Sequence, residues 1–347
     1  MKSPIFIYVL MCVVTVFSFP AELLSQQVPF TVEEITFHYE DFKVAGELRL
    51  PQSGEPYGVM IFIHGDGPND RTSGGAYPPI MERMLSAGFA TFAWDKPGTG
   101  KSTGKLSGSE LFKHRTGIVL KAIELLKHHQ SIDENKIGLW GISQAGYIIS
   151  MVLKESKDIH FLIAVSCPGE ASVAQTSYLI SRQAMCAGVD SVEAKKIESL
   201  YEVAERAQTY EEYKNAKSKI DSYPALEKMG IKMRVRPEND WERPDLNGRY
   251  YFNPMPVLEK ATMPVLAFFG EKDTQVDPIQ GMAAWDEALK KAGNSNYRIE
   301  LITGVDHCMF ISETGCLEEV FSREVARYEP AFLNIIDEWL QSLRGEF

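Results

Sequence analysis

Metal-binding patterns are scarce in this sequence of 347 residues, which has only five cysteines and no HExxH motif. The cysteine spacings do not match a zinc site, so we expect no metal. Basic residues are in the minority, because 36 Lys and Arg stand against 47 Asp and Glu and leave a net charge of −11. Nucleic-acid binding needs a basic face. We therefore expect no nucleic-acid partner, no cofactor, and a small molecule or short peptide as the partner.

The chain also lacks the composition of a disordered protein or of a small disulfide-framework protein. A hydrophobic fraction of 44% with 24% charged residues is typical of a chain that buries a full core. The sequence contains no internal repeat and no low-complexity tract. At roughly 150 residues per domain, the length fits one large domain or two smaller ones.

The first 25 residues have the pattern of a secretory signal peptide. An apolar run over residues 5–19 follows Lys2 and precedes a polar segment. The run is shorter than the roughly 20 residues that a membrane-spanning helix needs. We therefore predict residues 1–25 as a signal peptide, a secreted or periplasmic location, and no membrane span in the mature chain. An uncleaved anchor is the alternative.

Four cysteines lie outside this segment: Cys167, Cys186, Cys308 and Cys316. In an oxidising compartment, Cys308 and Cys316 form one candidate disulfide, and buried free thiols are the alternative.

Short apolar runs of strand length alternate with helical patterns along most of the chain. The predicted strands are residues 35–40, 43–50, 58–63, 90–94, 136–140, 161–166, 265–269 and 297–302. The predicted helices are residues 80–87, 111–129, 144–154, 279–292 and 322–343. The first two strands flank a turn and predict an antiparallel hairpin. Continuous apolar strands separated by helices predict a parallel sheet covered by helices on both faces.

Residues 171–250 interrupt this alternation. They contain two mixed-charge helical patterns, at 192–207 and 210–220, and then a stretch rich in Pro, Trp and Arg at 236–243. The strand predicted at 265–269 belongs with the first half of the chain. We therefore predict a helical cap inserted into one α/β core of residues 26–170 and 251–347. An independent second domain is the alternative.

A serine stands on a sharp turn between a predicted strand and a predicted helix. Strand 136–140 is followed by the sequence GISQAG at residues 141–146, with Ser143 at the turn. Small residues flank it where the backbone must approach itself, and the dipole of the following helix favours negative charge there. A bare GxSxG match is common by chance, and here Ala145 replaces the last glycine. The strand before and the helix after it identify Ser143 as the candidate nucleophile.

A serine hydroxyl needs a base to become nucleophilic, and in this architecture the acid and the histidine follow the serine in that order. Candidate acids stand at 270–273, just after the strand at 265–269. Of the seven histidines, only His307 lies downstream of them, in a loop that follows the strand at 297–302. His307 is therefore the predicted base.

Three carboxylates compete for the role of the acid. Asp277 precedes Pro278 and an amphipathic run, which is the pattern of a helix N-cap. Asp273 follows the strand directly and has no comparable structural role. We therefore predict that Asp273 orients His307, ahead of Asp277 and Glu271.

Acyl transfer also requires hydrogen-bond donors for an oxyanion. The backbone N–H of Gln144, next to the nucleophile, is one predicted donor. The second is predicted in the loop after strand 58–63, at Asp66, with Gly67 as the alternative. An ordinary Gly/Pro turn would explain the same residues, and His64 is predicted to be a structural residue of this loop.

Five motifs of the chain occur together in the order of a known family. They are HGDGPNDR at 64–71, WDKPGTGKS at 94–102, GISQAG at 141–146, GEKD at 270–273 and Asp306-His307. The combination resembles the α/β-hydrolase superfamily, and most of all its secreted esterase, prolyl-oligopeptidase-like and dienelactone-hydrolase-like branches, which often carry a helical cap. The resemblance implies an eight-stranded, mostly parallel sheet, a Ser143–Asp273–His307 triad, and hydrolysis of an ester or amide through an acyl-enzyme.

The predicted function is a serine hydrolase that cleaves a carboxylic ester or a related acyl bond. A peptidase or aminopeptidase acting on small peptides is the first alternative, and a non-catalytic hydrolase fold that binds ligands is the second. The motif at 95–102 resembles a phosphate-binding loop, but Asp95 occupies a position that requires glycine. Candidate substrate-binding residues are Arg71, for a carboxylate, and Trp241 and Tyr251, for an acyl or aryl group. For Arg71, pairing with groups around Asp70 is the alternative. Packing is the alternative for both aromatic residues.

Overall fold

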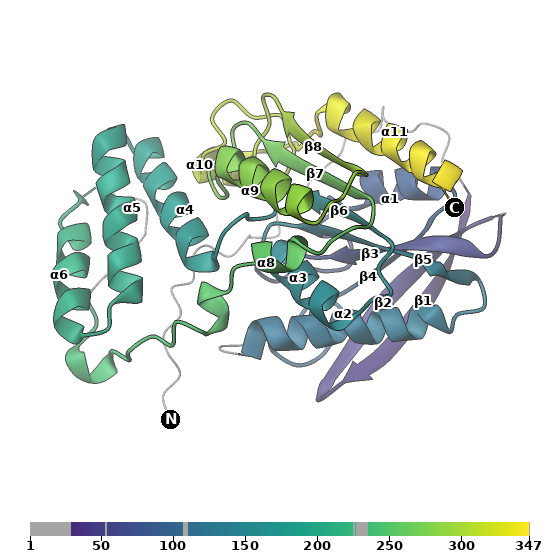
Figure 1. Cartoon of the computed structure of the whole chain (residues 1–347), viewed down its shortest axis with the longest axis horizontal. Helices are drawn as coiled ribbons and strands as arrows, with labels where there is room; N and C mark the ends of the chain where they lie inside the picture. The colour runs from purple at the N-terminus through teal and green to yellow at the C-terminus, as the bar shows by residue number, and fades with distance from the viewer. Residues whose placement is uncertain (1–28, 53, 107–109, 225, 227–234, 347) are drawn as a thin grey trace.

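The computed structural model describes residues 29–346, except for residues 53, 107–109, 225 and 227–234. The predicted signal peptide lies outside this range. Figure 1 shows a twisted sheet covered by helices, with a separate group of helices beside it. In the part of the chain that the structure describes, no helix combines the length and the hydrophobicity needed to cross a bilayer.

Eight strands form one mixed sheet in the order β1-β2-β4-β3-β5-β6-β7-β8. Their bounds are Phe30–Tyr39 (β1), Phe42–Pro51 (β2), Tyr57–Ile63 (β3), Ala90–Trp94 (β4), Ile132–Ile142 (β5), Phe161–Val165 (β6), Val265–Gly270 (β7) and Tyr297–Ile302 (β8). β2 pairs antiparallel with β1 and β4, and all other neighbours pair in parallel. The predicted fold class, an α/β-hydrolase fold with a mostly parallel eight-stranded sheet, is confirmed.

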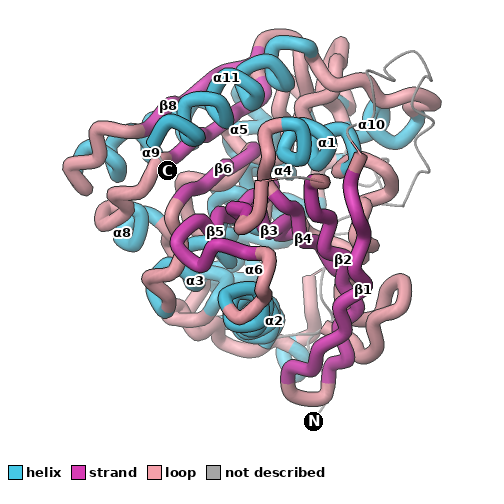
Figure 2. The backbone as a smooth tube through the Cα atoms, turned by 90° about the vertical axis from the view of Figure 1, so that its right-hand side faces the viewer, coloured by secondary structure: helices cyan, strands magenta, loops and turns pink. Residues whose placement is uncertain are grey.

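The continuous apolar strands are explained by burial of both faces of the sheet. In β3, Val59, Ile61 and Ile63 point into one hydrophobic cluster, whereas Met60 and Phe62 point into the other. Helices α2 (Leu111–Lys127), α3 (Ala145–Glu155) and α9 (Pro278–Lys291) cover the first cluster. Helices α1 (Pro78–Ser86) and α11 (Pro330–Glu346) cover the second, on the opposite face (Figure 2). Alternate residues therefore serve two cores.

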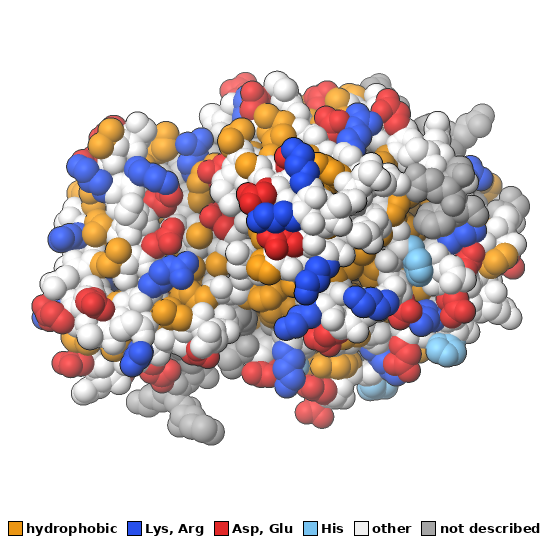
Figure 3. All heavy atoms as spheres, viewed as in Figure 1, with side chains coloured by type: hydrophobic (Ala, Val, Ile, Leu, Met, Phe, Trp, Pro, Cys, Tyr) orange, Lys and Arg blue, Asp and Glu red, His pale blue; other side chains and the backbone are white. Residues whose placement is uncertain are grey.

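The cap is a bundle of α4 (Ser172–Cys186), α5 (Ser191–Arg206) and α6 (Tyr210–Asp221). Asp190 caps α5 by accepting the N–H groups of Val192 and Glu193, and Thr209 forms a capping box with Glu212 on α6. The three helices share a small hydrophobic cluster of their own, which includes Ile180, Ile197 and Ile220. Figure 3 shows acidic and basic side chains interspersed over the cap and the core.

Two predictions about the fold are wrong in detail. The helix predicted at 322–343 begins eight residues later, because α11 starts at Pro330. Only Ser322 of the predicted range belongs to a preceding helix, α10 (Leu317–Ser322), and Tyr328 between the two helices bridges to Phe310. The predicted Cys308–Cys316 disulfide is also wrong. Cys316 pairs with Cys186 at the end of α4, with 5.9 Å between the Cα atoms, and Cys308 keeps its thiol group. Sequence spacing carried no information about a partner 130 residues away.

Replacement of Cys186 by serine should lower the melting temperature, because the disulfide closes a long loop and contributes about 3–5 kcal/mol by chain entropy. We expect a loss of roughly 5–15 °C in a thermal melt. Reductant should shift wild type by a similar amount and leave Cys186→Ser unchanged. Cys308→Ser is the control. A wild-type melting temperature that does not respond to reductant would contradict the pairing.

Candidate active site

Ser143 lies on a tight turn between β5 and α3, with a backbone φ of 59°. This left-handed conformation is uncommon for a residue with a side chain and is found at functional turns. The N–H of Ser143 donates to the carbonyl of Val165 in β6, and its own carbonyl accepts from Gly146, both at 2.9 Å. The turn has the geometry of a nucleophile elbow.

Close backbone contacts explain the small residues around this serine. A Cβ atom at Gly141 would lie 2.8 Å from the Cβ of Ala145, so position 141 cannot carry a side chain while 145 does. The glycine at 141 therefore leaves room for the side chain of Ala145. A Cβ at Gly65 would lie 3.5 Å from the Cβ of Ser143. The loop after β3 is therefore packed directly against the serine.

His307 and Asp273 form a buried hydrogen-bonded pair, with 2.7 Å between Nδ1 and Oδ2. The other oxygen of Asp273 accepts the N–H groups of Gln275 at 2.7 Å and Val276 at 2.9 Å, which fixes the carboxylate. Burial lowers the pKa of His307, but the charge and the hydrogen bond of Asp273 outweigh this effect, so that the pKa is raised. The pair can therefore stabilise an imidazolium in a site closed to water.

All three triad candidates follow carboxyl ends of parallel strands. Ser143 follows β5, Asp273 follows β7, and His307 lies in the loop after β8. Ends of parallel strands meet at one edge of a sheet, where open α/β sheets bind ligands. Among the described residues, no hydrogen bond joins the Ser143 hydroxyl to His307. Catalytic hydrogen bonds are often long in a protein without substrate.

The other carboxylates near the histidine have structural partners. Asp277 caps α9 by accepting the N–H groups of Ile279 and Gln280, as the sequence predicts. Glu271 accepts the N–H of Gly304 at 2.8 Å. Both assignments favour Asp273 as the orienting acid.

An ion pair that the sequence analysis missed lies beside the base. Arg323 approaches Asp306 at 2.8 Å, and both side chains are buried. The second oxygen of Asp306 accepts the N–H groups of Cys308 and Phe310. These bonds shape the turn that carries His307. The Asp306-His307 motif pointed to Asp306 in the sequence. Arg323 lay in a segment predicted as a helix, and nothing in the sequence indicated that it would pair with Asp306.

The first cap helix holds the loop that carries Asp273. The Tyr178 hydroxyl donates to the carbonyl of Asp273 at 3.0 Å. Gln183 donates to the Thr274 hydroxyl at 2.8 Å, and Gln175 donates to the Gln275 carbonyl at 2.6 Å. The Cys186–Cys316 disulfide fixes the end of α4 to the same region, since Thr274 donates to the carbonyl of Gly315 at 2.6 Å. The cap is therefore attached to the loop of Asp273, the candidate acid.

Gln144 connects the elbow with the loop of the predicted oxyanion donors. Its side-chain nitrogen donates to the Asp66 carboxylate at 3.0 Å. The contact of His64 is with the backbone of its own loop, because its Nε2 lies 2.9 Å from the carbonyl of Asp70. Burial lowers the pKa of His64 to about 3, so the ring is neutral. These contacts favour the structural role predicted for His64.

Comparison with known proteins identifies the family. A family model of X-Pro dipeptidyl-peptidases (S15 family) matches residues 25–307, which is most of the chain. The chain belongs to the S15 family. It is also 21% identical over 303 residues to the esterase EstD of Thermotoga maritima, covering 83% of this chain and 64% of EstD. An uncharacterized 31.7 kDa protein of Escherichia coli is 23% identical over 257 residues, covering 73% of this chain and 85% of the relative.

Solved structures share the fold of this S15-family protein. The Pyrococcus furiosus esterase Pf2001 is 18% identical, with a TM-score of 0.54 over 90% of this chain and 93% of the esterase. A putative dipeptidyl aminopeptidase IV from Bacteroides ovatus is 14% identical, with a TM-score of 0.53 over 90% of this chain and 36% of that protein. These neighbours show the fold, and family membership identifies the chain as a hydrolase of the S15 family.

The structure gives Arg71 a role other than the predicted binding of a substrate carboxylate. Its guanidinium group forms hydrogen bonds with Asp95, including one of 2.9 Å, and with Glu34 at 3.0 Å. Asp95 also accepts the N–H of Lys101 at 2.8 Å. The residues that resembled a phosphate-binding loop thus surround a buried ion pair. Arg71 joins the motif at 64–71 to the motif at 94–102.

Trp241 and Tyr251, the other predicted substrate-binding residues, contact the cap. Trp241 stacks on Tyr213 with 5.9 Å between ring centroids. The hydroxyl of Tyr251 donates to the carbonyl of Glu205 in α5. These contacts favour packing over substrate binding.

A groove of about 720 Å³ lies between α2, α3 and the segment after the cap. Its lining includes Phe112, Met151 and Phe252, but none of the three triad candidates. The groove is therefore separate from the site at the carboxyl edge of the sheet.

Activity should fall as the pH is lowered through the raised pKa of His307, because a base must be neutral to accept the serine proton. Asp273→Asn removes the charge that raises this pKa. We expect kcat to fall by about 10⁴-fold, and the acidic limb of the kcat/KM profile to move to lower pH. Asp277→Asn is the matched control, since asparagine also caps helices. An unmoved limb in Asp273→Asn would contradict the pairing.

Tyr178→Phe should lower kcat about fivefold with little change in KM, because it removes one hydrogen bond of about 1 kcal/mol from the loop of the acid. Tyr223→Phe removes a cap hydroxyl that bonds to Glu193 instead. This control should keep wild-type kinetics. Equal effects of both variants in steady-state assays would refute a specific link between α4 and Asp273.

Proposed function

We propose that the protein hydrolyses carboxylic esters of small molecules through an acyl-enzyme on Ser143. The observation that carries the proposal is the serine elbow at the same sheet edge as a buried His307–Asp273 pair. Family membership and the esterases among its relatives support it.

Each residue has a defined step in the proposed reaction. Asp273 accepts a hydrogen bond from the Nδ1–H of His307, which leaves Nε2 free to take the proton of Ser143 as its oxygen attacks the carbonyl carbon. The N–H groups of Gln144 and Asp66 hold the resulting oxyanion. His307 then gives its proton to the leaving alcohol oxygen. Water repeats the sequence, and the acid is released while Ser143 regains its proton.

A peptidase acting on short peptides is the second candidate, because the family is described by an X-Pro dipeptidyl-peptidase activity. We favour esters because one of the relatives, EstD, is described as an esterase. The structural neighbour Pf2001 carries the same description.

We also propose that residues 1–25 are a signal peptide that directs the chain out of the cytoplasm. The Cys186–Cys316 disulfide supports this proposal, because disulfides persist mainly in oxidising compartments.

The proposal is tested with short-chain nitrophenyl esters beside X-Pro and aminoacyl anilides. We expect ester hydrolysis, little anilide hydrolysis, and a loss of at least about 10⁴-fold in Ser143→Ala. Efficient cleavage of X-Pro anilides would instead establish the peptidase. Wild-type protein that turns over neither class and resists a fluorophosphonate probe would be a non-catalytic hydrolase fold. Labelling that persists in Ser143→Ala would refute the assignment of the nucleophile.

A further inference from the structure

Three side chains hold the carbonyl groups of the loop after β3, one from the loop itself and two from other parts of the fold. Lys96 donates to the carbonyl of Gly65 at 2.9 Å and also to that of Gly67. Asn69 donates to the carbonyl of Asp66 at 2.9 Å. Arg115, from α2, donates to the carbonyl of His64. Four consecutive carbonyls of this loop therefore have fixed directions.

Fixed carbonyls determine the directions of the N–H groups, because the C=O of one residue and the N–H of the next point opposite ways in a trans peptide. The bond from Lys96 to the Gly65 carbonyl thus orients the N–H of Asp66, the proposed oxyanion donor. The bond from Asn69 orients the N–H of Gly67 in the same way. A loop rich in glycine would otherwise sample several orientations.

Arg115 joins the two halves of the proposed oxyanion site. One arm of its guanidinium group donates to the His64 carbonyl, and the other donates to the side-chain oxygen of Gln144. Gln144 in turn donates to Asp66 at 3.0 Å. The same side chain therefore contacts the residue after the nucleophile and the loop of the second donor.

The guanidinium group of Arg115 carries its charge in the interior of the protein, which is unusual. Arg115 is 5% exposed, and among the described residues it forms no ion pair. Burial lowers its pKa to about 10, against the opposing charge of Asp66. A buried charge without an ion-pair partner is costly. If the only role of this position were to fill the core, an apolar side chain would do so without this cost.

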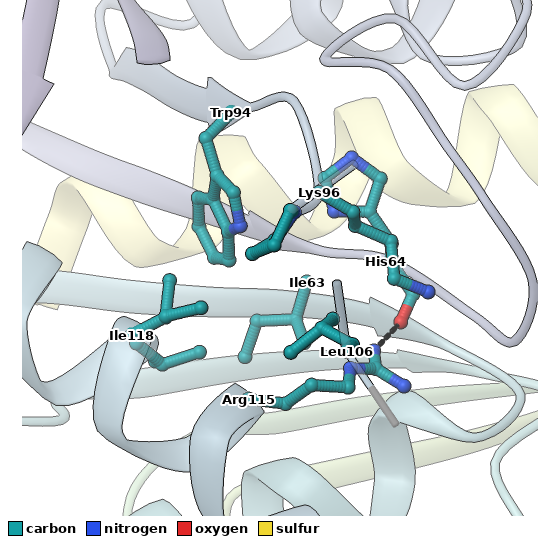
Figure 4. A pocket seen from close by; sticks show the side chains of 9 residues that line it. Ile63, His64, Trp94, Lys96, Leu106, Arg115 and Ile118 are labelled. Carbon is teal, nitrogen blue, oxygen red and sulfur yellow. Dashed lines mark hydrogen bonds between the residues drawn. The ribbon is translucent and has the colours of Figure 1, made fainter. Parts of the chain in front are cut away.

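The surroundings strengthen the effect of this charge. Arg115 and Lys96 line a cavity of about 10 Å³ together with Trp94, Ile63 and Leu106 (Figure 4). A cavity of this size has room for at most about one water molecule. Charges act more strongly where water is excluded. Both cations therefore lie behind the loop in a nearly dry, mainly apolar setting.

We propose that Arg115 and Lys96 are positioning residues of the oxyanion hole, which hold the loop that presents the N–H of Asp66, fix the side chain of Gln144, and place positive charge behind the developing oxyanion. The inference rests on the proposed function. Negative charge on the carbonyl oxygen develops only in the transition state, so these residues should act on kcat and not on KM.

The test compares Arg115→Met, Arg115→Lys and Lys96→Met with wild type, with nitrophenyl ester as substrate. The enzyme concentration used to calculate kcat is the concentration of active sites, titrated with a fluorophosphonate. We expect Arg115→Met and Lys96→Met to lower kcat by about 10- to 100-fold, with KM within about twofold of wild type. Arg115→Lys should recover part of the loss. Arg83→Met is the control, because Arg83 pairs with Asp337 far from the site, and it should keep wild-type kcat.

A second measurement separates positioning from a general structural role. A phenylboronic acid forms a tetrahedral adduct with a catalytic serine, so its inhibition constant should rise in parallel with the loss of kcat/KM. Added guanidinium ion should restore part of the kcat of Arg115→Ala. A purely structural defect would lower the melting temperature without this rescue.

Gln144→Ala decides the question if the Arg115 variants do not fold. This variant removes the side-chain oxygen to which Arg115 donates, and Gln144 is only partly buried. We expect a five- to tenfold fall in kcat at unchanged KM. Wild-type kcat per titrated site in Arg115→Met, or in Gln144→Ala where it must serve instead, would overturn the inference. Wild-type protein that is not labelled at Ser143 would overturn the proposed function itself, before any variant is compared.

Discussion

The parallel pairing of β5 through β8 is the constraint on which the rest of the structure depends. It brings the carboxyl ends of four strands to one edge, and the segments after three of them carry Ser143, Asp273 and His307. Ser143 and His307, which are more than 150 positions apart in sequence, lie at the same edge because their strands point the same way. The two hydrophobic clusters fix this arrangement, since a strand buried on both faces cannot shift its register without exposing apolar side chains.

Polar side chains outside the sheet hold the loops at its carboxyl edge in place, whereas the sheet itself only brings these loops together. On one side, α4 and its disulfide bind the loop of Asp273. On the other side, Arg115 and Lys96 bind the carbonyls of the loop after β3. The cap is thus part of the support of the site, and the interior cations belong to the same support. Rigid loops of this kind are what electrostatic stabilisation of a transition state requires.

Local patterns were sufficient to predict the strands, the elbow and the only downstream histidine. Ser143 and His307 could be proposed as catalytic residues because strand-turn-helix geometry and chain order leave few choices. Arg115 could not be found, since a lone arginine in a helix pattern looks like a solvated residue. The partner of Cys316 and the ion pair of Arg71 were also inaccessible. Each depends on a contact distant in sequence, for which spacing gives no signal.

The central claim is that Ser143, His307 and the two N–H donors act on one carbonyl carbon. A crystal structure of the protein inactivated by a fluorophosphonate tests this claim most directly. We predict a covalent bond from Ser143 Oγ to phosphorus, with His307 Nε2 in hydrogen-bond contact with the adduct. The phosphoryl oxygen should lie about 3 Å from the N–H groups of Gln144 and Asp66. An adduct on another residue, or His307 turned away from it, would contradict the account.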